Sequence, residues 1–119
     1  MKLELLPKKS WGRAMFRTLE PVTSGIWVIP AGFETDLASV PRFAWWFVNP
    51  VDPDVAPCAV VHDYLCRQAQ YSATGWKERK YADQTFYRCL RKRGVKIRAP
   101  FMYLAVRIGA LLAKLRGRI

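Results

Sequence analysis

The sequence predicts an α+β fold, in which a small N-terminal β-hairpin or antiparallel sheet packs on a three-helix C-terminal half. Two observations support this prediction. Short apolar segments bounded by turn-forming residues occupy the first third of the chain, and apolar residues at helical spacing occupy its second half. The chain has 119 residues and is 51% hydrophobic, which excludes a disordered protein and fits a single domain over residues 1–119.

Residues 1–50 are predicted to hold the hairpin and an ordered acidic loop. The segments 14–22 and 24–29 are rich in apolar and β-branched residues and meet at a Thr-Ser-Gly turn, so we expect them to pair. The segment 32–42 mixes acidic, hydroxyl and small residues, which favours an ordered loop. The aromatic run 43–47 is expected to pack over the core or to form one edge of a cleft.

Residues 57–116 are predicted to form three helices after a proline-rich break in the chain. The first helix spans about 57–69 and the second about 76–93, where Gly94 stops it. A proline opens the third helix, which spans about 100–116.

The third predicted helix is amphipathic, with Arg107, Lys114 and Arg118 on the stripe opposite its apolar residues. We expect the apolar stripe to dock on the core, with peripheral contact to an anionic membrane or a partner helix as the alternative. An arginine in the middle of this helix excludes a transmembrane span. The stripe consists of Phe101, Leu104, Ala105, Ile108, Leu111, Leu112 and Leu115.

The formal net charge of +11 is concentrated in a basic block over residues 77–98. Such a block suits an anionic surface, whether phospholipid, nucleic acid or an acidic protein face. A solvated helix face that keeps the protein soluble is the alternative. The residues that we expect to contact an anionic partner are Arg88, Arg91, Lys92, Arg93, Lys96 and Arg98.

Cysteine content and the N-terminus bear on the compartment. The three cysteines are an odd number and lack the density of a secreted disulfide framework, so we expect a reducing compartment. The N-terminal segment MKLELLPKKS lacks a long apolar run, so we expect no signal peptide.

The chain has one histidine, His62, and it is the centre of the candidate site. Helical spacing places Cys58, His62 and Cys66 on one face of the first helix. The two cysteines are about 12 Å apart along the axis, too far for both to reach one zinc ion at about 2.3 Å. A three-ligand zinc site formed by this helix alone is therefore excluded, and His62 with one cysteine and distant ligands is the remaining metal-site alternative.

Asp83 lies on the apolar side of the second helix and needs a partner there. Antiparallel packing would bring His62 opposite Asp83, so that the carboxylate fixes the imidazole tautomer and the other nitrogen can take a proton from water. Asp63 points about 100° away and, with Asp36, would make an oxygen-rich site of the calcium type. Alternatively, His62 and Asp83 are a buried structural pair and Asp63 faces solvent.

Three segments carry a resemblance: GFETDLASVPR at 32–42, VVHDYLC at 60–66 and ADQTFYRCL at 82–90. Together they resemble a family of small proteins of unknown function encoded by tailed phages and prophages, over about residues 20–110. The resemblance implies a phage origin and a location in the host cytoplasm or the virion. The motif residues expected to support the loop and the site are Gly32, Thr35, Ser39, Arg42 and Tyr64.

The His-Asp pair on one helix, with an aspartate on the next, is also similar to secreted phospholipases A2. That resemblance implies that His62 is the base, Asp63 a calcium ligand and Asp83 the orienting carboxylate. The chain departs from the pattern at Cys66, where those enzymes have tyrosine, and its 32–42 segment has a single glycine in place of a glycine-rich calcium loop. Their disulfide framework is also missing.

Two functions follow as hypotheses. The first is a metal-assisted hydrolase of phospholipid or another cell-envelope ester or amide, with calcium as cofactor. The second is a non-enzymatic phage structural or accessory protein, binding a virion, tail or host protein, in which the same residues form a structural network. Exposure discriminates between them, because catalysis needs one nitrogen of His62 open to a cleft whereas a structural network encloses the imidazole.

Overall fold

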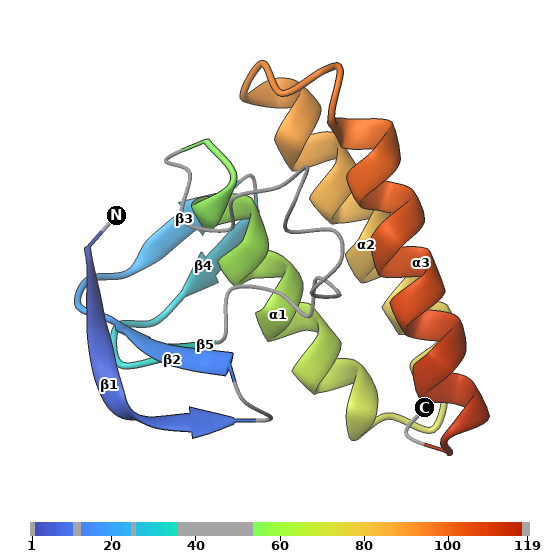
Figure 1. The fold of residues 1–119 in the computed structure, drawn as a ribbon, viewed down its shortest axis with the longest axis horizontal. Coiled ribbons are helices and arrows are strands. Elements are labelled where there is room, and N and C mark those ends of the chain that lie inside the picture. Colours follow the sequence, from blue (N-terminus) through green and yellow to red (C-terminus); the bar gives the residue numbers. More distant parts are fainter. Residues whose placement is uncertain (1, 11–12, 25, 36–53, 118–119) are drawn as a thin grey trace.

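The α+β architecture predicted from the sequence is confirmed in the computed structural model, which describes residues 2–10, 13–24, 26–35 and 54–117. Small antiparallel sheets precede three helices, α1 (Ala56–Gln70), α2 (Gly75–Lys92) and α3 (Ala99–Leu115). The strands pack against α1, α2 packs on α1, and α3 lies beside α2 at the edge farthest from the strands (Figure 1).

The strands form two small sheets. A three-stranded antiparallel sheet has the order β1 (Leu3–Ser10), β2 (Arg13–Thr18) and β5 (Glu34–Thr35). The second sheet pairs β3 (Val22–Ser24) with β4 (Trp27–Ile29).

The predicted pairing of 14–22 with 24–29 is correct in part. The second sheet is a hairpin in this region, but the first predicted strand is interrupted before Pro21, and its N-terminal part pairs with β1 instead. The strand β1 was not predicted because Pro7 lies within it. It is an edge strand, and its register shifts between Leu5 and Lys9, which is where a sheet tolerates a proline.

The start of the predicted acidic loop is fixed by Thr18. Its buried hydroxyl donates to the carbonyl of Pro30 over 3.1 Å and accepts from the amide of Phe33 over 3.0 Å. Gly32 has a φ of 86°, a conformation that glycine adopts without strain, and its amide donates to the Thr18 carbonyl. Glu34 and Thr35 form β5 instead of loop, and Thr35 is fully buried.

The rest of the predicted loop and the aromatic run lie outside the described residues. These predictions include the metal ligand Asp36, the supporting residues Ser39 and Arg42, and the apolar segment 43–47.

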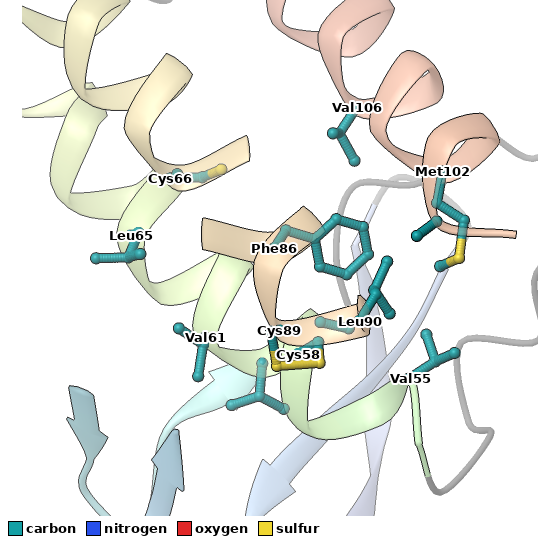
Figure 2. Packing of buried hydrophobic residues seen from close by; sticks show 14 of the residues in the cluster. Val55, Cys58, Val61, Leu65, Cys66, Phe86, Cys89, Leu90, Met102 and Val106 are labelled. Atoms are coloured by element: carbon teal, nitrogen blue, oxygen red, sulfur yellow. A yellow bond between two sulfur atoms is a disulfide. The ribbon is translucent and has the colours of Figure 1, made fainter. Parts of the chain in front are cut away.

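The core lies between the sheets and the helices. Phe86 and Leu90 of α2 are fully buried, and Figure 2 shows them between the residues of α1 and Met102 of α3. A disulfide joins Cys58 of α1 to Cys89 of α2 across this core. Because disulfides persist in oxidising environments, the expectation of a reducing compartment does not agree with this bond.

The helix boundaries agree with the predicted ones to about one residue at each end. Pro57 and Pro100 occupy the first turns of their helices, where a missing amide hydrogen costs nothing. Gly94 follows α2 with a φ of 86° and ends it, as expected. Among the described residues, no helix is long and apolar enough to span a membrane.

The prediction for the buried face of α3 is wrong. Small residues and Met102 pack inward, whereas the large apolar side chains face solvent. Arg107 and Lys114, expected on the outer stripe, instead point toward α2, where both lie over the ring of Trp76. Of the predicted core stripe, Ala105 is buried; the exposed members are Phe101, Leu104, Ile108, Leu111, Leu112 and Leu115.

Candidate functional site

The predicted contact between His62 and Asp83 is present at the α1–α2 interface. The helices run antiparallel across a short turn, and His62 Nε2 lies 2.6 Å from Asp83 Oδ1. Both side chains are 0% exposed, and the ring of Phe86 packs on the imidazole at 5.0 Å between centroids. The apolar spacing of the two helices therefore places a charged pair in the centre of the protein.

Two arginines complete the surroundings of Asp83. Arg79 Nε donates to Oδ1 over 3.1 Å, and Arg107 of α3 donates to Oδ2 over 2.9 Å. Arg79 also donates to the carbonyl of Val106 over 3.3 Å, so it joins α2 to α3. A buried carboxylate that accepts from two guanidinium groups and an imidazole is well compensated for its loss of hydration.

Sequence reasoning did not single out Arg79 or Arg107 as members of this network. A signal existed for Arg79, because it precedes Asp83 by four residues on one helix, a spacing at which opposite charges meet. Arg107 gave no such signal. It lies 24 residues from Asp83, so the contact depends on how α3 is rotated.

Cys66 is the third neighbour of His62. Its Sγ lies 3.8 Å from Nδ1 and 3.5 Å from Nε2, one helical turn along α1. Burial opposes protonation, but Cys66 and the Asp83 carboxylate outweigh it and raise the pKa of His62 from 6.5 to about 9. These neighbours therefore favour the protonated form of His62.

This geometry restricts the chemistry of the network. A general base needs an unprotonated nitrogen within reach of water, whereas the pKa of His62 is raised and its side chain has no exposed surface. Donor atoms of His62, Cys66 and Asp83 lie within 4.8 Å of one another, which is the spacing of metal ligands. However, the two guanidinium groups on Asp83 and the charge of the imidazolium oppose a cation at this position.

Asp63 does not face solvent, contrary to one of the two predictions for it. The residue is 5% exposed, and its Oδ2 lies 3.4 Å from Arg67 on the next turn of α1. The Arg67 guanidinium lies over the ring of Phe33, which meets Tyr64 edge to face. Tyr64 thus contacts the start of the acidic loop, where sequence analysis placed it.

The calcium hypothesis stays a prediction, because its second ligand, Asp36, lies outside the described residues. The described partner of Asp63 is a cation, Arg67, which already neutralises part of its charge. A calcium ion would therefore compete with this guanidinium for the carboxylate.

The predicted basic block lines the second half of α2 and the turn after it. Arg88, Arg91, Lys92, Arg93 and Lys96 are exposed, and Arg98 is half-buried. The sequence contains no Asp or Glu after Asp83, so this end of the chain is purely cationic.

A pocket of about 430 Å³ opens between α2 and α3 beside the basic block. Arg91 donates to the Tyr87 hydroxyl over 3.1 Å, and the rings of Tyr87 and Tyr103 meet edge to face at 5.5 Å. Sequence analysis did not predict this pocket, because residues of two different helices line it. The described residues that line it are Gln84, Tyr87, Arg88, Pro100 and Tyr103.

These features define a class of small α+β domains, in which a helical hairpin encloses a histidine, a carboxylate and two arginines. Within this class, the chain belongs to the family described as Protein of unknown function (DUF1353), whose model matches residues 14–106. The match includes His62, Arg79 and Asp83. No curated protein and no solved structure matches the chain.

Proposed function

We propose that this protein is a non-enzymatic accessory protein that binds an anionic phospholipid surface through α3. The observation that carries the proposal is the orientation of α3, which packs small residues on α2 and presents large apolar side chains to solvent. The phage origin implied by the motif resemblance is part of the same proposal. Of the two locations implied with it, host cytoplasm and virion, the virion agrees better with the Cys58–Cys89 disulfide.

The exposed residues form one continuous apolar stripe. They recur at intervals of three or four along α3, which places them on one side over about 21 Å of helix. Phe101 is 65% exposed, Leu104 58% and Leu115 75%. Scattered single apolar residues are normal on a protein surface, whereas a contiguous stripe is typical of an interaction site.

The charge around the stripe favours an anionic lipid surface. Arg98 lies three residues before Phe101, and Arg116 lies four residues after Leu112, so both guanidinium groups flank the apolar residues. A helix with an apolar face and cationic flanks lies in the membrane interface, with its apolar side chains among the acyl chains. A second copy of this chain fits less well, because pairing through α3 would juxtapose two cationic ends.

The ionic network has a structural role in this proposal. Arg107 can reach Asp83 only when α3 is rotated so that its large apolar stripe points away from α2. The network thereby fixes which face of α3 meets the membrane. The full enclosure of His62 supports this role over that of a catalytic base.

Vesicle sedimentation tests the proposal. Vesicles of phosphatidylcholine with phosphatidylglycerol are expected to bind the protein, whereas vesicles of phosphatidylcholine alone bind it at least about tenfold more weakly. Leu104→Glu places a charge in the stripe and is expected to abolish binding. Leu5→Glu is the matched control, because Leu5 is 64% exposed on β1, away from α3. Equal binding by the two variants, or none by the wild type, would contradict the proposal.

The hydrolase hypothesis is the second candidate, and the contact between His62 and its orienting carboxylate is the observation that favours it. Hydrolysis would require His62 to release its proton and to reach water, and its raised pKa and full burial weigh against this. The test is calcium-dependent turnover of phospholipid by the wild type and by folded His62→Gln. Turnover that is lost in the variant would support hydrolysis over simple binding.

A further inference from the structure

We infer that the pocket between α2 and α3 binds a phosphate monoester, which in the membrane setting is the headgroup of a lipid such as phosphatidate. That the ligand is a lipid headgroup rests on the proposed membrane function. That the pocket binds a phosphate monoester rests on the pocket's own residues. It assigns specificity to residues outside the apolar stripe, namely Gln84, Tyr87, Arg88 and Tyr103.

The polar groups that line the pocket are available to a ligand. Within the described part of the chain, the side chains of Gln84 and Arg88 and the hydroxyl of Tyr103 have no hydrogen-bond partner. The Tyr87 hydroxyl accepts from Arg91, which leaves its own hydrogen free to donate. The pocket therefore offers hydrogen-bond donors from an arginine, an amide and two hydroxyl groups.

The charge of the pocket selects for an anion. None of the five described lining residues carries a carboxylate, and the guanidinium of Arg91 lies 5.7 Å from the ring centre of Tyr87, which is one of them. The acidic residue preceding this region in the sequence, Asp83, is buried and already accepts from two arginines. Phosphate oxygens accept strong, often bidentate hydrogen bonds from guanidinium groups, and a monoester carries more charge than a diester.

The position and size of the pocket suit a lipid headgroup. Its volume of about 430 Å³ exceeds that of a phosphate group alone and lies within the range of small-molecule sites. Pro100 and Tyr103 immediately precede Phe101 and Leu104, which belong to the apolar stripe. A lipid whose acyl chains meet the stripe can thus place its headgroup in the adjacent pocket.

Headgroup selectivity is the first test. Vesicles that contain phosphatidate or phosphatidylglycerol are prepared with the same surface potential, and the wild type is expected to prefer phosphatidate at least about tenfold. Arg88→Gln is expected to remove this preference. Arg93→Gln is the matched control, because it removes the same charge from an exposed residue outside the pocket, and it should weaken binding to both vesicles equally. Equal behaviour of the two variants, or no preference by the wild type, would overturn the inference.

A soluble ligand separates this inference from the proposed function. Glycerol 3-phosphate is titrated against the protein without vesicles, and chemical-shift changes at the Gln84 side chain report its binding. Saturable binding that is at least about tenfold weaker in Arg88→Gln assigns the phosphate site. Such binding in Leu104→Glu, together with lost vesicle binding, shows that stripe and pocket act separately. If vesicles never bind but glycerol 3-phosphate does, the membrane proposal fails and the ligand is a soluble phosphate ester.

A conservative variant completes the test. Tyr103→Phe removes one hydroxyl from the pocket and keeps the ring against Tyr87. We expect at least about tenfold weaker binding of glycerol 3-phosphate, since a hydrogen bond from a hydroxyl to a charged phosphate is lost. Unchanged affinity would exclude this hydroxyl from the site, and with an unaffected Arg88→Gln variant it would overturn the inference.

Discussion

The interface between α1 and α2 and the outer face of α3 depart from the usual distribution of residues in opposite directions. The interface encloses His62, Arg79 and Asp83, which are charged or polar and all buried. The outer face presents large apolar side chains such as Phe101 and Leu115 to solvent. Buried charges are compensated here by one another, whereas the exposed apolar stripe has no described partner within the chain.

One residue connects the two regions. Arg107 extends from α3 to Asp83 and lies over Trp76 on the way. If α3 were rotated to bury its leucines, Asp83 would lose this guanidinium and the cation would need another partner. The comparison thus teaches that the ion pair between Arg107 and Asp83 determines which face of α3 is exposed. The following experiments test the buried network and the exposed stripe separately.

Removal of the central charge is expected to have the largest effect. Asp83→Asn leaves two arginines and the imidazolium without their anion, so the free energy of unfolding is expected to fall by about 3 to 5 kcal/mol. Urea unfolding followed by circular dichroism measures the change. Glu4→Gln is the control, because its exposed pair with Arg17 contributes less than about 1 kcal/mol. A loss as small as that of the control would contradict the network.

Removal of the disulfide is expected to have a slightly smaller effect. The bond joins residues 31 apart, and a closed loop of that length stabilises a fold by about 3 to 4 kcal/mol. The double variant Cys58→Ala with Cys89→Ala should show this loss in urea, and the wild type should match it after addition of a reducing agent. A wild type that is insensitive to reduction would show that the two cysteines do not pair in solution.

The orientation of α3 is tested by truncating one side chain on each face. Met102 is buried against α2, so Met102→Ala is expected to cost about 2 to 4 kcal/mol. Leu104 is exposed, so Leu104→Ala should change the stability by less than about 0.5 kcal/mol. Thermal or urea unfolding of both variants gives the comparison. The reverse order of the two losses would show that the leucines face the core.

The last prediction concerns the change in stability per pH unit. His62 is the one histidine of the chain, and its pKa is raised from 6.5 to about 9 in the fold. The folded state therefore binds more protons than the unfolded state between these values. The contribution of His62 to stability is complete below about pH 6.5 and is lost as pH rises toward 9, at roughly 1 kcal/mol per pH unit.

The measurement uses the imidazole resonances, which need no assignment because there is a single histidine. A titration of these resonances is expected to give a midpoint well above 7, and urea midpoints should fall between pH 7 and 8. His62→Gln is the control, in which this slope is absent. A midpoint near 6.5 with no slope would place His62 outside the ionic network.

Sequence patterns were sufficient where the decisive interactions are local. Proline marked the starts of α1 and α3 and Gly94 marked the end of α2, and the length of α1 and α2 brought His62 opposite Asp83. Sequence patterns were insufficient where a residue far away in the chain determines which side chains are buried. Which face of α3 is buried depends on Asp83 and Trp76 of α2, so the stripe of largest apolar residues was the wrong guide.

Two other discrepancies have the same origin. The strand β1 contains Pro7, and only its pairing with β2 shows that an irregular edge strand can include it. The number of cysteines suggested reduced thiols, but the packing of α1 on α2 brings Cys58 and Cys89 within bonding distance. The pairing of β1 has no signal in the spacing of residues, whereas the antiparallel packing that brings His62 opposite Asp83 also brings Cys58 close to Cys89.

The disulfide also closes a covalent loop that leaves out the strands before Cys58 and the helix after Cys89. The loop between Cys58 and Cys89 contains His62, Arg79 and Asp83, whereas Arg107 and all of α3 lie beyond it. Thermal fluctuations that separate α3 from α2 therefore leave the closed part linked. Amide hydrogens of α3 are expected to exchange with solvent before those of α1 and α2, because α3 can separate from α2 while the disulfide holds α1 and α2 together.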